Sequence, residues 1–280
     1  MPDLMDLHAH SSESDGSLSP KELVEHAAAV GVKALVLTDH DTTDGLKEFF
    51  AAAGDKGIEA FGGVEISAEW KKGNCHILGY GVADDYEPLE AMLRKTRDSR
   101  DKRNEMIVAK LDELGVGFDL SEAAELAGGD VVGRPHIARV MMKKGYVGSV
   151  QEAFDKYLAK GAPAYIDRFR LPPREAVTLL REAGATVILA HPSQLKRSIR
   201  EIEDMVGELV ALGLAGLEVY TPYADDEQVA EFERIVRTHG LGATGGSDFH
   251  GESKPAHKLG YYREGVAIPA RCAEVLKRGK

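Results

Sequence analysis

Imidazole and carboxylate side chains recur where short apolar segments of the chain end. His8 and His10 follow the first segment, and Asp248 and His250 follow the last. Residues two apart in an extended chain point to the same side, so each pair could bind one cation. Further residues of these types lie in or after other segments: Asp15, Asp39, His40, Asp41, Glu65 and His191. Because carboxylates crowded at one edge repel each other, divalent metal ions are the simplest compensation, and the pattern predicts a metal cluster.

The apolar segments predict the strands that hold these side chains. Seven are predicted as buried strands: 4–7, 34–37, 61–66, 77–80, 186–190, 216–219 and 241–244. Helices alternate with them, with signals for helices over 19–31, 172–184 and 225–240. This alternation predicts an α/β fold with a mainly parallel sheet, either open or closed into a barrel. In both arrangements, active sites lie at the carboxyl ends of the strands.

His76 departs from the pattern, because it begins an apolar segment instead of ending one. The sequence from Glu65 to Gly81 is compatible with an antiparallel hairpin that turns near Lys71 to Asn74. In such a hairpin the second strand returns beside the first, and His76 has the side-chain parity to face Glu65. A hairpin would thus place an imidazole next to this carboxylate.

Residues 92–163 interrupt the alternation. They predict helices near 92–114, 121–127, 134–144 and 149–159, and the last begins with a capping box. A helical stretch of this length inside an α/β pattern predicts an inserted subdomain. Basic residues are concentrated at 92–110 and 131–170. We interpret them either as solvated helix faces or as an edge that overhangs the active site and binds phosphate.

The composition excludes some classes of function. The chain has 280 residues and a net charge of −11, which argues against a surface that coats duplex nucleic acid. A small anionic substrate in a local pocket remains compatible with this charge. The two cysteines, Cys75 and Cys272, form no CxxC pair and favour a reducing cytoplasm. We expect no signal peptide and no membrane span.

Taken in order along the chain, these motifs resemble the PHP family, named for polymerase and histidinol phosphatase. The resemblance is carried by DLHAHSSESDG at 6–16, TDHD at 38–41, GVEIS at 63–67, the strand with His76, AHP at 190–192 and GSDFH at 246–250. It implies a distorted (β/α)7 barrel, built from residues 1–91 and 164–280, with three adjacent metal positions. GRPHIAR at 133–139 is similar to small members that act on nucleotides, and implies that the all-helical insertion, 92–163, caps the substrate.

The resemblance also implies which residues bind metal. The first position would be formed by His8, His10, Glu65 and Asp248, the second by Glu65, His76 and His191, and the third by Asp15, His40 and His250. Of these, Glu65, His191, Asp248 and His250 would be catalytic. Aspartate at position 15, where the family sometimes has histidine, favours a harder ion. We expect two or three divalent ions, with Mn²⁺ preferred and Zn²⁺ or Fe²⁺ as alternatives.

Other residues are assigned supporting roles. Asp6 and Asp39 each neighbour a predicted ligand, and either accept the second N–H of a metal-bound imidazole or cap a loop. Arg134 is the first choice for binding substrate phosphate, because its planar guanidinium suits that group. Weaker candidates, equally well interpreted as surface residues, are His136, Arg168 and Arg197. Glu65 is preferred to Glu69 as ligand, and no role is assigned to His26, His239 or His257.

These observations predict a metal-dependent phosphoesterase that hydrolyses a phosphate ester of a nucleotide, such as a 3′,5′-bisphosphate, by attack of metal-bound hydroxide. A 5′–3′ exonuclease acting on short oligonucleotides is the first alternative. Histidinol phosphatase, a non-catalytic PHP module and hydrolysis of a C–N bond are further alternatives. The uninterrupted set of predicted ligands argues against the non-catalytic module. No protein partner is predicted.

Overall fold

Seven strands form one curled sheet within the residues that the computed structural model describes, 4–71, 73–82, 86–127 and 131–277. In spatial order they are β1 (Leu4–Ala9), β2 (Val32–Leu37), β3 (Glu59–Trp70), β4 (Gly73–Tyr80), β5 (Thr186–Leu189), β6 (Leu214–Tyr220) and β7 (Gly242–Gly245). Among the described residues, β1 and β7 are not paired directly; an isolated bridge joins Ala9 of β1 to Phe249, which lies after β7. The α/β fold and the distorted seven-stranded barrel are thereby confirmed.

Strand direction follows the prediction of a mainly parallel sheet that contains one antiparallel hairpin. β1, β2 and β3 run parallel, as do β5, β6 and β7, but β4 is antiparallel to both of its neighbours. The predicted hairpin of β3 and β4 is confirmed, although Lys72 at its turn lies outside the described residues. Because β4 is reversed, its amino end lies at the edge where the parallel strands have their carboxyl ends. His76 can therefore begin a strand and still face the site.

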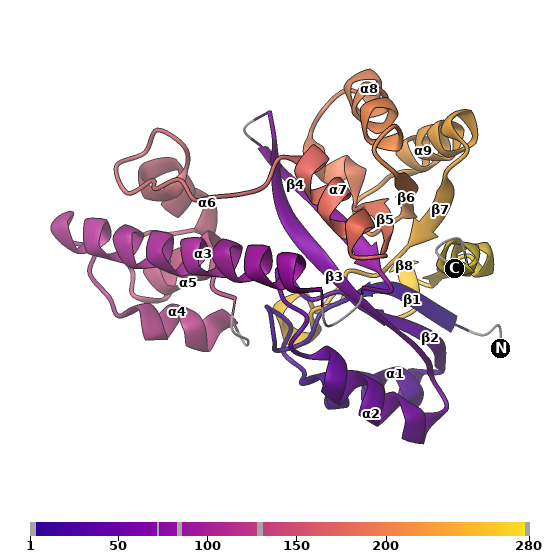
Figure 1. The fold of residues 1–280 in the computed structure, drawn as a ribbon. Coiled ribbons are helices and arrows are strands. Elements are labelled where there is room, and N and C mark those ends of the chain that lie inside the picture. The colour runs from indigo at the N-terminus through magenta and orange to yellow at the C-terminus, as the bar shows by residue number, and fades with distance from the viewer. Residues whose placement is uncertain (1–3, 72, 83–85, 128–130, 278–280) are drawn as a thin grey trace.

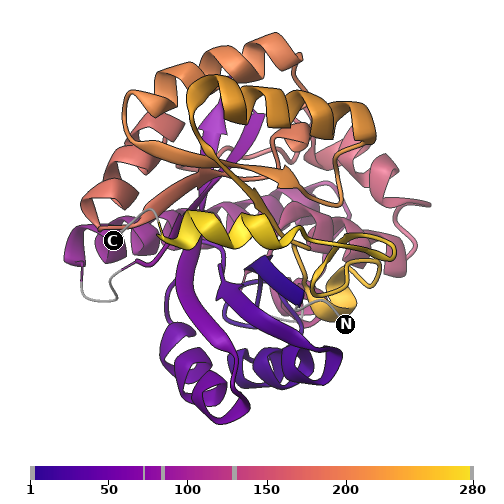
Figure 2. The same cartoon turned by 90° about the vertical axis from the view of Figure 1, so that its right-hand side faces the viewer.

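Helices cover the outside of the sheet. They are α1 (Pro20–Val30), α2 (Leu46–Lys56), α7 (Pro173–Glu182), α8 (Ile199–Val210) and α9 (Asp226–His239). Figures 1 and 2 show α1 and α2 on one side of the barrel and α8 and α9 on the opposite side. The prediction missed α2, which has no side-chain cap at Gly45. It also missed α8, although Ser198 and Glu201 form a capping box there that could have revealed it.

The middle of the chain projects from the barrel, at the left of Figure 1. It contains α3 (Glu87–Glu113), α4 (Leu120–Ala127), α5 (Arg134–Lys143), α6 (Val150–Ala153) and a π-helical turn, η1 (Phe154–Leu158). These helices share a second hydrophobic core that includes Ile107 and Ile137. The first turns of α3 belong to the barrel instead, since Leu89 and Leu93 are part of its core. Helix α3 is thus a continuous helix that contributes to both cores.

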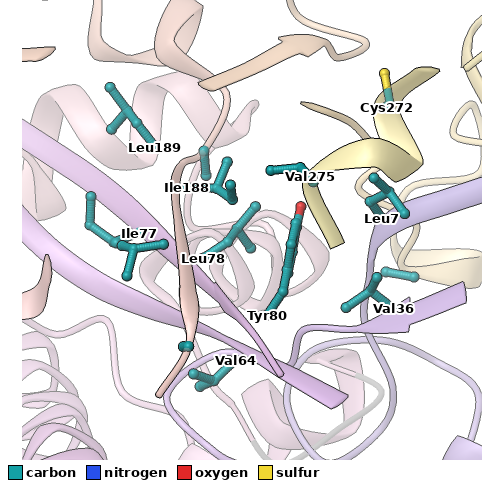
Figure 3. Packing of buried hydrophobic residues seen from close by; sticks show 14 of the residues in the cluster. Leu7, Val36, Val64, Ile77, Leu78, Tyr80, Ile188, Leu189, Cys272 and Val275 are labelled. Atoms are coloured by element: carbon teal, nitrogen blue, oxygen red, sulfur yellow. The ribbon is translucent and has the colours of Figure 1, made fainter. Parts of the chain in front are cut away.

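The end of the chain fills the gap between β7 and β1. A 3-10 helix, η4 (Ala270–Lys277), packs against both strands, and Figure 3 shows its Cys272 and Val275 beside Leu7 and Tyr80. Gly242 is required for this contact, because a Cβ there would lie 2.8 Å from the Val275 side chain. The remaining short elements are η2 (Pro192–Leu195), η3 (Gly251–Ser253), β8 (Tyr261–Arg263) and β9 (Val266–Ala267).

No helix among the described residues is long and apolar enough to cross a membrane. Both cysteines are buried free thiols.

Candidate metal centre and its cleft

Glu65 lies at the centre of the histidine cluster. Its side chain is fully buried, in the part of β3 that faces the carboxyl edge of the sheet. One carboxylate oxygen, Oε1, lies 2.9 Å from His76 Nδ1 and 2.9 Å from His191 Nε2. β4 supplies His76, and His191 directly follows β5. The structure therefore brings together the three residues predicted for the second metal position.

The second oxygen of Glu65, Oε2, faces a different group of imidazoles. His8 Nε2 lies 3.2 Å away, His10 Nε2 3.3 Å and His40 Nδ1 3.0 Å. Asp248 Oδ1 is 3.5 Å from His8 Nε2 and 3.3 Å from His10 Nε2. The four residues predicted for the first position thus converge, and Glu65 stands between the first and second positions.

The residues predicted for the third position form a neighbouring group. Asp15 Oδ1 lies 3.1 Å from His250 Nε2, and Asp15 Oδ2 lies 3.8 Å from His40 Nε2. His10 also borders this group, at 3.8 Å from Asp15 Oδ1. All nine predicted ligands therefore come together at one end of the barrel.

This arrangement fits divalent cations. Three groups of side chains have potential ligand atoms within 4.8 Å of one another: His8, His10, Glu65 and Asp248; His40, Glu65 and His76; and His10, Asp15, His40 and His250. The first group is the predicted first position, the second has His40 where His191 was predicted, and the third adds His10 to the predicted residues. Buried Glu65 Oε2 and His250 Nε2 have no hydrogen-bond partner among the described residues. His8 Nε2 and His10 Nε2 lie only 3.1 Å apart, which suits two ligands of one ion. Oxygen and nitrogen donors of this kind bind Mn²⁺, Fe²⁺ and Zn²⁺.

The cluster perturbs the ionisation of its own members. Burial alone would raise the pKa of Glu65, but the surrounding histidines, His40 and His8 foremost, outweigh it and hold the pKa well below its usual value. Burial also favours neutral His10, yet Asp248 and Glu65 raise its pKa to about 9. Carboxylates that stay ionised in a buried site are suited to hold cations.

Two backbone positions at the cluster are strained. His191 and Asp248 have positive φ angles, 24° and 50°, although neither is glycine. Such conformations cost free energy and are concentrated at functional sites. Gly246 avoids a clash at the same edge, because a Cβ there would lie 2.2 Å from the Cβ of His8.

Glu218 is a member of the site that the sequence analysis missed. It is fully buried in β6, with Oε1 at 3.0 Å from His8 Nδ1. Its Oε2 accepts a hydrogen bond from the backbone N–H of His191 at 2.7 Å. Glu218 thus orients two predicted ligands, one through its imidazole and the other through its backbone N–H. The signal for it was a lone charged residue in the apolar segment 214–220.

Asp6 and Asp39, which could have accepted the second N–H of a metal-bound imidazole, bind backbone N–H and hydroxyl groups instead. Asp6 accepts backbone N–H groups from His8, Ser247 and Gly260 at 3.2, 2.9 and 2.8 Å. Asp39 accepts the N–H and hydroxyl of Ser11 and the hydroxyl of Ser14. Neither accepts a hydrogen bond from an imidazole within the described residues. The geometry therefore favours their alternative role, which is to fix the loops that carry the ligands.

Asp248 has two further partners that the sequence did not indicate. Its Oδ2 accepts a hydrogen bond from the Tyr223 hydroxyl and lies 2.6 Å from Lys254 Nζ. Burial opposes ionisation of Asp248, but Lys254 and His250 outweigh burial and hold its pKa well below the usual value. The other oxygen of Asp248, Oδ1, faces His8 and His10.

A cleft of about 280 Å³ lies in front of the cluster and is lined by both halves of the molecule. Asp15, His40, His76 and His250 contribute to it from the cluster. Cationic and imidazole side chains reach it from the insertion and its flanks: Arg100, His136, Arg139, Arg168 and Lys254. The cleft is thus a cavity in which an anion would meet positive charge on several sides.

Arg100 and Arg168 are the most deeply placed of these cations. Arg100, on α3, pairs with the carboxylate of Asp41 and donates to the Ser67 hydroxyl at 2.9 Å. Burial, together with repulsion from Arg100, lowers the pKa of Arg168 to about 8. Arg168 Nη1 is buried without a hydrogen-bond partner among the described residues. A buried guanidinium with an unused donor is a ready anion ligand.

The other predicted phosphate ligands are placed differently. Arg134 is not part of the cleft lining. It donates to the Leu158 carbonyl at 3.0 Å, and its Cζ lies over the Tyr165 ring, 5.4 Å from the centroid. Exposed Arg197 donates to the Lys71 carbonyl at 3.2 Å, also outside the lining. The sequence motif could not show that the side chain of Arg134 turns into the insertion. His136 does line the cleft.

The histidines without an assigned role, and Glu69, lie outside the cluster. His26 stacks on Phe249, His239 lies 3.8 Å from Glu203, and His257 Nδ1 is 2.9 Å from the Asp248 carbonyl. Glu69 pairs with Arg170 at 2.7 Å, so it does not compete with Glu65.

Fold and site together define a β/α-barrel protein with a carboxylate-centred metal-binding cluster. The sequence matches the model of the PHP domain family over residues 6–165. The chain belongs to the PHP family.

Similar proteins have been characterised by sequence and by structure. A 3′,5′-nucleoside bisphosphate phosphatase of Chromobacterium violaceum is 33% identical over 97% of this chain and 94% of its own length. A 5′–3′ exoribonuclease of Haemophilus influenzae is 35% identical over 88% of this chain and 89% of its own. A solved structure from Bifidobacterium adolescentis, described as that of a metal-dependent phosphoesterase, has a TM-score of 0.85 at 28% identity and covers 100% of this chain and 98% of its own.

Proposed function

We propose that this chain is a metal-dependent phosphoesterase that hydrolyses a phosphate ester of a nucleotide. The observation that carries the proposal is the pairing of Glu65, which faces five imidazoles, with buried arginines across one small cleft. The first half of this arrangement suits divalent metals, and the second half suits phosphate. Relatives named as a phosphatase and an exoribonuclease support the same class of reaction.

The metal positions keep the predicted sets of ligands, and each set shares at least two residues with one of the three groups of side chains. We assign His8, His10, Glu65 and Asp248 to the first, Glu65, His76 and His191 to the second, and Asp15, His40 and His250 to the third. Glu65 would bridge the first two through its separate oxygens. Asp15 favours Mn²⁺, with Zn²⁺ or Fe²⁺ as alternatives, in two or three positions. When bound, such ions supply an activated water and neutralise charge on the phosphoryl oxygens.

The chain's own residues bind and orient the substrate. Arg168 and Arg100 hold the phosphate from the side opposite the cluster, and His136 and Arg139 border the same cleft. They replace Arg134 and Arg197, which do not line it. Glu65, His191, Asp248 and His250 remain the proposed catalytic residues, because all four belong to the proposed metal positions and His250 also lines the cleft.

The insertion is proposed to cap the substrate. Residues 92–163 would form the cap, and 1–91 with 164–280 the metal-binding barrel. Support comes from α5 and α3, which bring His136, Arg139 and Arg100 to the cleft from the side of the second core. The boundary at residue 92 falls within α3, so barrel and cap are joined by a continuous helix. A cytoplasmic location and the absence of a protein partner stay predictions.

A 5′–3′ exonuclease is the second candidate, favoured by the similarity to the Haemophilus influenzae exoribonuclease. Both reactions cleave a phosphate ester and need the same cluster. They differ in whether the substrate continues beyond the cleft.

Hydrolysis of a panel of substrates tests the proposal, followed as release of inorganic phosphate and, for the trinucleotide, as shortening to mononucleotides. The panel contains adenosine 3′,5′-bisphosphate, a nucleoside monophosphate, histidinol phosphate and a 5′-phosphorylated trinucleotide, each with Mn²⁺, with Zn²⁺ and with chelator. We expect metal-dependent hydrolysis of a nucleotide substrate. Glu65→Gln should reduce it by more than about a hundredfold, since residues that merely support ligands contribute roughly 10- to 100-fold.

Glu69→Gln is the matched control, because Glu69 lies in the same strand but pairs with Arg170. It should retain most of the activity. Hydrolysis that persists in chelator, or equal losses in the two variants, would contradict the assignment of Glu65. Release from histidinol phosphate alone would contradict the nucleotide substrate.

A further inference from the structure

A second and larger cavity lies on the other side of Asp248 from the arginine cleft. It has a volume of about 830 Å³ and is lined by the β8–β9 hairpin, the segment 256–258 and Pro222. The 280 Å³ of the metal cleft is at the small end of ligand pockets, which typically measure about 300–1,000 Å³. The metal cleft therefore has room for about one nucleotide, and the second cavity has room for more substrate.

Ring contacts connect this cavity to the metal cluster. His191 meets Tyr223 with ring centroids 5.8 Å apart, and Tyr223 meets His257 with centroids 5.4 Å apart. His257 lines the second cavity, and its Nδ1 lies 2.9 Å from the backbone carbonyl of Asp248. The rings of Tyr223 and His257 thus connect the predicted ligand His191 to the second cavity.

The loop that forms the cavity is fixed to the cluster at a second point. The N–H of Gly260 donates to Asp6 at 2.8 Å, and Asp6 also holds the backbone of His8. The cavity is therefore positioned by the same carboxylate that positions a predicted ligand. The loop of the cavity and the backbone of His8 are thus held in fixed relation to each other.

The lining combines aromatic rings with cations. Tyr261, Tyr262 and His257 supply rings, and Lys258 and Arg263 supply positive charge. Arg263 is held by Asp226 and stacks on Tyr262, with 5.3 Å from its Cζ to the ring centroid. Lys258 is exposed and has no side-chain partner among the described residues. Rings that offer a face, beside cations that neutralise phosphate, are the means by which proteins bind single-stranded nucleic acid.

We propose that this cavity binds the part of a single-stranded oligonucleotide that lies on the 3′ side of the cleaved bond. The 5′-terminal nucleotide occupies the arginine cleft, the bond to be cleaved lies at the cluster, and the next base stacks in the second cavity on Tyr261. Lys258 then faces the following phosphate. This inference rests on the proposed phosphoesterase function and adds to it a substrate that extends beyond one nucleotide.

Two substrates of different length test the proposal. The kcat/KM is measured for a 5′-phosphorylated RNA trinucleotide and for adenosine 3′,5′-bisphosphate, with wild type, Tyr261→Ala and Lys258→Ala. Since removal of a stacking ring weakens binding of a base considerably, we expect Tyr261→Ala to lower the value for the trinucleotide about tenfold. Lys258→Ala should lower it several-fold, more at low salt than at high salt. The bisphosphate, which ends at the cluster, should be hydrolysed at the wild-type rate.

Matched controls exist elsewhere in the chain. Tyr146→Ala removes an exposed tyrosine of the insertion, and Lys33→Ala an exposed lysine of β2; neither residue lines a cavity described above. Both variants should hydrolyse both substrates like wild type. Equal rates for the trinucleotide in wild type and in both cavity variants would overturn the proposal. A parallel loss on both substrates would also overturn it, because the cavity would then support the cluster and not the strand.

A binding measurement separates this proposal from the proposed function. Fluorescence anisotropy of a dye-labelled trinucleotide is followed in chelator, where no hydrolysis is expected. Weaker binding by Tyr261→Ala and Lys258→Ala, but not by the controls, would support the cavity even if no substrate of the panel were hydrolysed. Unchanged binding in these variants would reject the cavity whatever the activity.

Discussion

At the scale of single residues, the cluster depends on carboxylates that the surroundings keep ionised and oriented. Glu65 separates its two oxygens between two sets of imidazoles, and Glu218 holds His8 and the backbone of His191 from behind. The two oxygens of Asp248 also have separate partners. Oδ1 faces the histidines, and Oδ2 contacts Tyr223 and Lys254. Glu65 thus faces the metal positions with both oxygens, Asp248 with one, and Glu218 only through the two ligands that it orients.

Glu218→Gln tests this support. An amide nitrogen would face either His8 Nδ1 or the N–H of His191, where the wild type places an acceptor. We expect metal affinity to fall by roughly 10- to 100-fold, as for other residues that orient ligands. Metal retained after dialysis, measured by elemental analysis, checks this. Glu203→Gln, which changes a helix surface, should retain metal like wild type, and full retention by Glu218→Gln would refute the role.

At the scale of elements, the β3–β4 hairpin and α3 bring opposite charges to one place. The reversal of β4 delivers His76 to Glu65, and α3 carries Arg100 from the second core to Asp41 at the edge of the cluster. Close backbone approach makes the hairpin possible. A Cβ at Gly63 would lie 2.9 Å from the Gly79 carbonyl oxygen and 3.1 Å from that of Leu37.

Gly63→Ala should therefore destabilise the protein. Its methyl group would press on backbone oxygens, which cannot rotate away, and such overpacking typically costs about 1–3 kcal/mol. The free energy of unfolding in urea measures the cost. Gly73→Ala is a suitable comparison in the same hairpin, because its new Cβ would have only an ordinary contact of 3.4 Å. Equal stabilities of the two variants would contradict the steric argument.

Phosphate should stabilise the metal-free protein through the arginine cleft. Burial and repulsion from Arg100, which lower the pKa of Arg168, disfavour its charged form in the folded state, and an anion would relieve this. We expect millimolar phosphate to raise the melting temperature of chelated protein. Arg168→Met should abolish the shift, whereas Arg197→Met, outside the cleft, should preserve it. A shift that survives Arg168→Met would place the anion elsewhere.

At the scale of the whole molecule, the barrel concentrates charge that its apolar interior cannot neutralise. Its edge holds Glu65 and Asp248 in buried positions and Asp15 in a partly buried one, surrounded by imidazoles whose charges depend on protonation. Metal ions would complete the neutralisation, so that folding and metal binding support each other.

Metal removal should accordingly lower thermal stability. A ligand at a hundred times its dissociation constant stabilises a protein by about 2.7 kcal/mol, which for a chain of this size corresponds to several degrees. Melting of chelated protein is compared with melting after Mn²⁺ is returned, and we expect a higher melting temperature with the ion. Glu65→Gln should lose most of this gain. An identical melting temperature with and without Mn²⁺ in wild type would argue against the cluster as a metal site.

The strands and most of the helices could be predicted from local patterns, because buried strands are apolar runs and helix caps are short motifs. The residues at the ends of the runs predicted a metal cluster, and the resemblance of the motifs to the PHP family named the nine ligands. Glu218 also left a signal, a charge within an apolar run, which gained meaning only beside His8. Residue spacing could place His76 near Glu65 because a hairpin is a local structure.

Only the tertiary structure decided which cations line the cleft. The sequence favours Arg134 over Arg168 as a phosphate ligand, but the Arg134 side chain turns into the insertion, whereas Arg168 lines the cleft. Lys254 and Tyr223 reach Asp248 from two different loops, and the second cavity arises where β8 and β9 lie beside them. Side-chain direction and contacts between distant segments depend on packing of the whole chain, so no local pattern encodes them.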